Sequence, residues 1–251
     1  MNADDKQDLW QGLESKAREA LQTRDYEKAD LAARLATSGV EAGELATDQP
    51  GPKPGLEDAW IPGVEIFHRQ VYQQHHRGWF AEFSRQNEGR LHDIGLWPQQ
   101  WATATMFANT AKGFHIHPPS IPEGTAAADW FQQLYVKEST NYENRPYDRE
   151  QWDAMFFVQG TIEFLLVDER AGMPRRVMRF IIEGDNRPGP GNIGLIIPAG
   201  VAHALRCAGS HDVIMVYGTS TSFEPTSEGR IASDIEQCSV PEDWQAYLDQ
   251  N

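Results

Sequence analysis

The sequence predicts a mainly β protein, an antiparallel β-barrel with a small helical segment at its N-terminus. From Trp60 onward, apolar residues occur in short runs, either alternating with polar residues or continuous, and Gly, Pro and Asn separate the runs. Many short strands between such turns favour an antiparallel sandwich or closed barrel over alternating strands and helices. Before Trp60, apolar residues recur at helical spacing within residues 5–38, which indicates two short helices.

Composition and charge narrow the class of protein. The 251 residues are 40% hydrophobic and 24% charged, as in an ordinary globular protein. A net charge of −15 and the lack of a Lys/Arg cluster argue against a nucleic-acid-binding surface. No apolar run approaches the roughly 20 residues that span a bilayer, and the acidic start MNADDKQD is unlike a signal peptide. We therefore expect a cytoplasmic protein that binds neither nucleic acid nor membranes.

The chain is expected to have two regions. Residues 1–58 are assigned to the helical segment and to a Pro/Gly-rich linker at 40–58. The two helices faintly resemble one tetratricopeptide unit, but one repeat cannot bury its own face, so a helical hairpin docked on the barrel or on a partner subunit is favoured. Residues 59–251 are assigned to the barrel domain.

Each apolar run of the barrel domain is expected to form strands. The runs are VEIFHRQVY, GWFAEF, ATATMFA, AMFFVQG, TIEFLLVD, VMRFIIEG, GLIIPAG and DVIMVYG. The stretch 118–150 interrupts this series, and its centre, AAADWFQQLYV, is consistent with one helix. An insertion of that length beside a barrel mouth is a candidate lid, and packing on a dimer partner is an equal alternative.

Three histidines stand where strands can present them together. In PAGVAH, His203 follows a tight turn and an apolar strand, which matches the second motif of the cupin barrels, PxGxxH. KGFHIH places His115 and His117 two residues apart, hence on the same face of a strand. His115, His117 and His203 are therefore candidate ligands of a transition metal, with packed core histidines as the alternative. The glutamate that metal cupins add after the second histidine is missing at the usual spacing, so we expect no metal and no cofactor.

The order of the motifs resembles one family, the dTDP-4-dehydrorhamnose 3,5-epimerases. IPGVEIFHRQVYQQHHRGWFAEF is similar to the family's IPGV opening followed by RGxFxE, and KGFH is similar to RGLH. QGTIEFLLVDER, PAGVAH and VYGTSTSFEP resemble the family's later motifs, in the same order. The similarity covers about residues 61–235. It implies a cupin, or jelly-roll, antiparallel β-barrel that forms a homodimer and acts as an isomerase on a nucleotide-linked 4-keto-6-deoxy sugar.

The resemblance also implies roles for single residues. His115 matches the general base, His203 a second pocket histidine, and Tyr217 the proton donor on the opposite face. A 4-keto group makes the neighbouring C–H protons acidic through an enolate, so a histidine base and a tyrosine acid suit the reaction. The residues expected to contact the nucleotide or the sugar are Arg77, Glu82, Lys112, His117 and Asp153.

Two departures from the family pattern concern charge. The family's lysine, which stabilises the enolate, aligns with Asp153, so an anion replaces a cation where negative charge develops. Candidate replacements for that cation are Lys137, Arg145 and Arg149. The carboxylate that orients the base histidine normally lies in a C-terminal segment that is shortened here, and its candidates are Asp234 and Asp243.

Other functions remain open at this point. The HxH of KGFHIH resembles the RGxHAH motif of the sugar 3,4-ketoisomerases, which makes such an isomerase the second enzyme candidate. A metal-binding cupin enzyme is a third. A cupin that binds a sugar nucleotide without turnover is the last, and loss of the lysine would explain it.

Overall fold

The computed structural model describes residues 31, 34–35, 40–117, 150–168, 170, 173–174, 176–184 and 188–223. Nearly all of residues 1–38, residues 118–149 and the segment after 223 lie outside the described residues. So do the expected N-terminal helix pair, the insertion, its three basic residues, Asp234 and Asp243. Within the described part of the chain, no helix is both long and apolar enough to cross a membrane.

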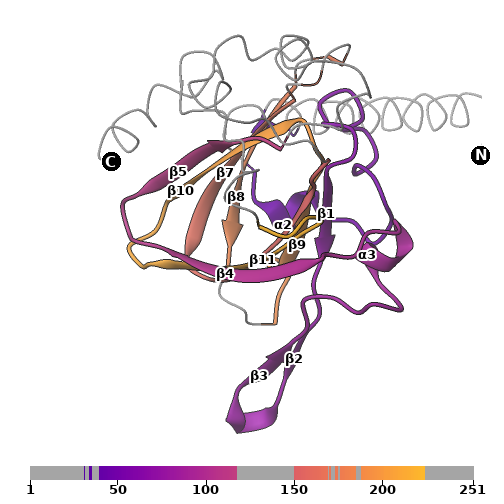
Figure 1. Ribbon diagram of the computed structural model, residues 1–251. Coiled ribbons are helices and arrows are strands. Elements are labelled where there is room, and N and C mark those ends of the chain that lie inside the picture. Colours follow the sequence, from indigo (N-terminus) through magenta and orange to yellow (C-terminus); the bar gives the residue numbers. More distant parts are fainter. Residues whose placement is uncertain are drawn as a thin grey trace, which may run out of the picture.

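Two antiparallel β-sheets face each other and form the body of the molecule (Figure 1). The five-stranded sheet has the order β1 (Glu65–His68), β9 (Ile193–Ile197), β6 (Asp153–Gln159), β11 (Val213–Thr219), β4 (Gln100–Met106). The four-stranded sheet has the order β5 (Ala111–His115), β10 (Val201–Cys207), β7 (Thr161–Asp168), β8 (Val177–Glu183). The predicted mainly β, cupin-type fold class is confirmed. The described strands pair within two separate sheets of a sandwich, and no pairing among them closes a continuous barrel.

Every predicted apolar run contains a strand. The first run contains two, β1 and β2 (Val71–Gln73), and the second contains β3 (Trp79–Ala81). The two histidine motifs supply β5 and β10. Because alternate residues of a strand point to opposite faces, the period of these runs also predicts which residues enter the core.

The core lies between the two sheets. Along β8 the buried residues alternate as Met178, Phe180 and Ile182, which is the pattern of a strand with one face inward. Phe164 of β7 stacks on Phe180 and meets Phe157 of β6 edge-on, with ring centroids 5.7 and 6.0 Å apart. Each such side chain contributes about 1.5–3 kcal/mol on burial. A register slip of one residue would turn them all outward, so this burial fixes the register.

The segment 40–58 differs from the expected linker. It contains the short helix α2 (Ala42–Leu45), and the amide of Ile181 in β8 donates to the carbonyl of Val40 at 2.8 Å. Its apolar side chains join the core between the sheets, namely Val40, Ala42, Leu45 and Leu56. The Pro and Gly residues predict a linker, whereas the apolar residues between these turns are buried.

A β-hairpin extends away from the two sheets (Figure 1). It consists of β2 and β3, joined through the 3₁₀ turn His75–Arg77. Its exposed aromatic rings include Tyr72 and Phe80, which stack with centroids 6.5 Å apart. After the hairpin, the helix α3 (Arg90–Asp93) returns the chain to the five-stranded sheet.

Candidate functional site

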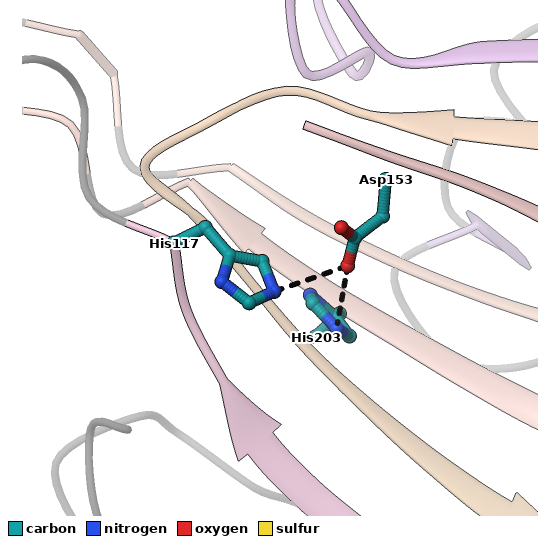
Figure 2. Close-up of side chains that lie close together, drawn as sticks. All are labelled: His117, Asp153 and His203. Carbon is teal, nitrogen blue, oxygen red and sulfur yellow. Dashed lines mark ion pairs between the residues drawn. The ribbon is translucent and has the colours of Figure 1, made fainter. Parts of the chain in front are cut away.

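Two histidines and one aspartate converge between the sheets. His117 follows β5, His203 lies in β10, and Asp153 begins β6 of the other sheet. Figure 2 shows the Asp153 carboxylate directed at both rings, with Oδ2 at 3.1 Å from His117 Nε2 and 3.8 Å from His203 Nε2. One ligand atom from each residue lies within 4.8 Å of the other two. The cluster therefore joins the two sheets through one carboxylate oxygen.

The pairing of β5 with β10 positions the histidines. His115 stands directly opposite His203, and a bulge follows in the register. Gly113 occupies that bulge with φ +143°, and a Cβ there would lie 2.4 Å from the Ala204 Cβ. The rings of His115 and His117 each have their centroid 5.7 Å from that of His203. The two-residue spacing thus brings both rings to one place, as the KGFHIH pattern predicts.

Asp153 is buried, with 3% of its surface exposed. Its Oδ1 accepts a hydrogen bond from Gln151 Nε2 at 3.0 Å, and the Thr221 hydroxyl donates to Gln151 Oε1. Within the described ranges, no lysine or arginine pairs with Asp153. Among the described residues, its neighbours are therefore two imidazoles and one amide, and the candidate cations Lys137, Arg145 and Arg149 lie outside this part of the chain.

Gln151 and Thr221 were missed in the sequence analysis. Gln151 precedes Asp153 by two residues, so strand periodicity places both side chains on one face. That spacing was the available signal for Gln151. Thr221 has no comparable signal, because it reaches Gln151 only through the pairing of β11 with β6.

Burial and charge act in opposite directions on this cluster. Burial alone raises the pKa of Asp153, but the charge and hydrogen bond of His117, with contributions from His203 and Gln151, outweigh burial and lower the pKa to about 2. Burial lowers the pKa of His203 to about 4, against the opposing attraction of Asp153. Near neutral pH, Asp153 is therefore an anion and His203 a neutral imidazole.

Tyr217 lies on the inner surface of the five-stranded sheet. It pairs with Met155, while Thr219 pairs with Asp153. Directly paired residues point to the same side of a sheet, and Tyr217 packs half-buried against the core between the sheets. Across this space, His203 shares its face with Leu166, another core residue. The strand registers thus place Tyr217 on one inner surface and His115 with His203 on the facing one.

The structure does not bring the other predicted contact residues to this cluster. Lys112 is exposed, and its Nζ donates to the Thr105 carbonyl at 3.4 Å. Arg77 is exposed in the turn of the projecting hairpin. Glu82 follows that hairpin and accepts two hydrogen bonds from Arg85, at 3.0 and 2.6 Å.

Comparison with solved structures shows what this fold resembles. A dTDP sugar isomerase of Desulfovibrio desulfuricans G20 superposes with a TM-score of 0.51 at 11% identity, over 71% of this chain and 89% of its own. A double mutant of ChmJ, a 3'-monoepimerase from Streptomyces bikiniensis in complex with dTDP, gives 0.51 at 18% identity, over 73% and 77%. The rmlC epimerase of Mycobacterium tuberculosis gives 0.50 at 17%, over 72% and 74%.

No protein-family model and no curated protein sequence matches this chain. The likeness to the solved structures is therefore one of fold at low sequence identity. It extends over more than two thirds of the chain in each case. These three neighbours are named as a dTDP sugar isomerase and two epimerases, and the chain shares their fold, as its motif order predicts.

Proposed function

We propose that this protein is an isomerase of the epimerase type that acts on a nucleotide-linked keto sugar by proton transfer. The observation that carries the proposal is the strand register, which puts His115 and Tyr217 on facing inner surfaces of the two sheets. A base on one side of a sugar ring and an acid on the other are what inversion at carbon needs. The shared fold and the order of the motifs support the same function.

In the proposed reaction, His115 is the general base. Its side chain is half-buried, whereas His203 beside it is 2% exposed, so His115 has better access to a substrate than His203 has. It removes the proton from the carbon next to the keto group, and the electrons of the broken C–H bond move onto the keto oxygen to form an enolate. Tyr217 then gives its proton to the opposite face of that carbon, and the keto group re-forms.

Solvent exchange tests the proton transfer. The full-length protein is incubated with a dTDP-4-keto-6-deoxy sugar in deuterated water, and deuterium at C3 and C5 is followed by NMR. We expect incorporation at both carbons. His115→Ala should reduce the exchange rate by about 10²–10⁴-fold, because a positioned general base contributes that much. His92→Ala, at an exposed histidine in α3, is the matched control and should keep the wild-type rate.

Tyr217→Phe separates the two steps of the same reaction. The variant keeps the ring and its packing, so it should still exchange deuterium through His115 but release little inverted sugar. Exchange confined to C3, with a 3-keto product, would instead identify a ketoisomerase. Measurable binding of the nucleotide sugar with no exchange at either carbon would contradict an enzymatic function and identify a binding protein.

The proposal includes a nucleotide site built from two subunits. Arg77, a predicted nucleotide contact, is carried on a hairpin that points away from the sheets of its own chain (Figure 1). It can therefore meet a nucleotide near the histidines only if the hairpin belongs to a second copy. The exposed Tyr72, Trp79 and Phe80 of that hairpin are the kind of large apolar side chains that interfaces cover. A homodimer is thus part of the proposed function.

A further inference from the structure

The cluster between the sheets has the composition of a metal site. His117 Nε2 and His203 Nε2 both approach Asp153 Oδ2, which comes from the opposite sheet, and one ligand atom of each residue lies within 4.8 Å of the other two. We propose that these three atoms bind one divalent first-row transition metal ion, with the remaining coordination positions open on the His117 side. Two imidazoles and one carboxylate with open positions are a known ligand set for such ions, including Fe²⁺ and Zn²⁺.

Two of the three distances between the ligand atoms are close to those around a bound ion, and the third is within 4.8 Å. Metal–ligand bonds of about 2.0–2.2 Å put neighbouring ligand atoms about 2.9–3.5 Å apart in octahedral or tetrahedral geometry. The 3.1 Å between His117 Nε2 and Asp153 Oδ2 lies in that range. The 3.8 Å between His203 Nε2 and Asp153 Oδ2 exceeds it by a few tenths of an ångström, which a small rotation of the carboxylate closes.

Gln151 orients the Asp153 carboxylate for metal binding. Its amide holds Oδ1 at 3.0 Å, so the other oxygen, Oδ2, is the one directed at both histidines. The Thr221 hydroxyl fixes the amide in turn by donating to its oxygen. Hydrogen-bonded partners that orient a ligand in this way are typical of metal centres.

Burial gives the site a closed and an open side. The side chains of His203 and Asp153 are 2% and 4% exposed, and that of His117 is 15% exposed. A carboxylate as buried as Asp153 must be paired, and in the described part of the chain no lysine or arginine pairs with it. An ion that enters past His117 would supply positive charge beside this carboxylate and keep coordination positions on the substrate side.

The use of the ion rests on the proposed function, whereas its binding does not. Asp153 aligns with the lysine that stabilises the enolate in the family that the sequence resembles. A divalent ion bound to Asp153 would restore positive charge at that place and stabilise the enolate oxygen as a Lewis acid. No electron transfer is involved, and the proton taken from carbon still goes to His115.

Metal binding is tested on the full-length protein without any substrate. The protein is stripped with a chelator and titrated with Zn²⁺, Co²⁺ or, without oxygen, Fe²⁺, and bound metal is counted by elemental analysis. We expect about one ion per chain, a Co²⁺ absorption spectrum of mixed nitrogen and oxygen ligation, and a Tm increase of roughly 5–10 °C at 100-fold excess over Kd. His117→Gln and Asp153→Asn should each weaken binding at least ~100-fold. The controls His92→Ala and Asp93→Asn, both exposed in α3, should bind normally.

Each outcome supports or overturns one statement. Less than about 0.1 ion per chain in wild-type protein that is folded by circular dichroism would overturn the metal site and leave a protonated His117 as the partner of Asp153. One ion per chain without deuterium exchange would keep the metal site and overturn the proposed reaction. Asp153→Lys, which should lose the ion but carry a fixed cation, is expected to retain exchange in chelator. If wild-type protein exchanges equally well in chelator, the ion has no part in the reaction.

Discussion

Gly113 is the residue on which the geometry of the β5 histidines depends. Its φ of +143° is rare for residues with a side chain, and a Cβ would collide with Ala204 of β10. His115 and His117 follow two and four residues later, so a shift of the β5 backbone would move both rings relative to His203. In the KGFH motif, the glycine therefore sets the shape of the strand, and the histidine supplies the chemistry.

We predict that Gly113→Ala destabilises the protein and disturbs the site. Backbone strain costs about 1–3 kcal/mol and the collision about 1–3 kcal/mol more. Gly78→Ala is the matched control, because Gly78 has φ +122° with open space around its Cβ position, so only the strain is present. Urea unfolding monitored by fluorescence measures both. Equal losses of unfolding free energy in the two variants would show that a Cβ at position 113 does not collide with Ala204.

At the scale of elements, a buried ion pair attaches α3 to the five-stranded sheet. Arg90 of α3 pairs with Glu65 of β1, and their side chains are 4% and 10% exposed. Arg90 also donates to the Thr47 carbonyl at 2.7 Å and lies over the Phe67 ring. Glu65 in addition accepts from the Gly51 amide. One ion pair thus joins the segment 40–58, β1 and α3.

Removing one member of this pair should cost far more than removing both. Glu65→Ala leaves the Arg90 charge buried and should lower the free energy of unfolding by about 3–5 kcal/mol. The double variant Glu65→Leu/Arg90→Met should recover most of that loss. Glu88→Ala, which breaks an exposed pair with Arg85, should change stability little. Chemical denaturation of the four proteins measures these losses, and a double variant no more stable than Glu65→Ala would contradict a strongly buried pair.

At the scale of the whole molecule, the hairpin β2–β3 separates residues that the proposed function needs together. Arg77 is carried away from the histidines of its own chain (Figure 1), so in the proposed function a second chain completes the nucleotide site. Two copies related by symmetry would exchange hairpins reciprocally, because a two-fold interface repeats each contact. A dimer with Arg77 inactivated in one chain and His115 in the other would then keep one intact site.

We predict that inactive variants complement each other. Arg77→Ala and His115→Ala should each lose exchange activity, whereas co-expression of both chains should restore about one quarter of the wild-type level, from the one intact site of each mixed dimer. A mixture of Glu88→Ala and His115→Ala chains is the control and should show only the activity of its intact chains. Light scattering should report a dimer. A monomer, or no recovery in mixed dimers, would contradict a site shared between chains.

The sequence by itself determined the strands and the pair of histidines on β5. Period-two apolar runs predict strands because the interior face of a strand is set by alternation along the chain, which is a local property. The same rule predicts that His115 and His117 share a face, and both rings lie beside His203. The order of the motifs predicted the fold, and the comparison with solved structures confirms it.

Only the tertiary structure decided what surrounds Asp153 and the segment 40–58. Asp153 meets His117 and His203 across two sheets, and the packing of one sheet on the other is set by side chains far apart in sequence. In the sequence, Asp153 stands at the position of the family's lysine. In the fold, it is the carboxylate of a histidine cluster. The segment 40–58 has the Pro and Gly of a linker, yet its apolar residues are buried against β8 and β1, because turn residues shape a chain without determining what its other side chains contact.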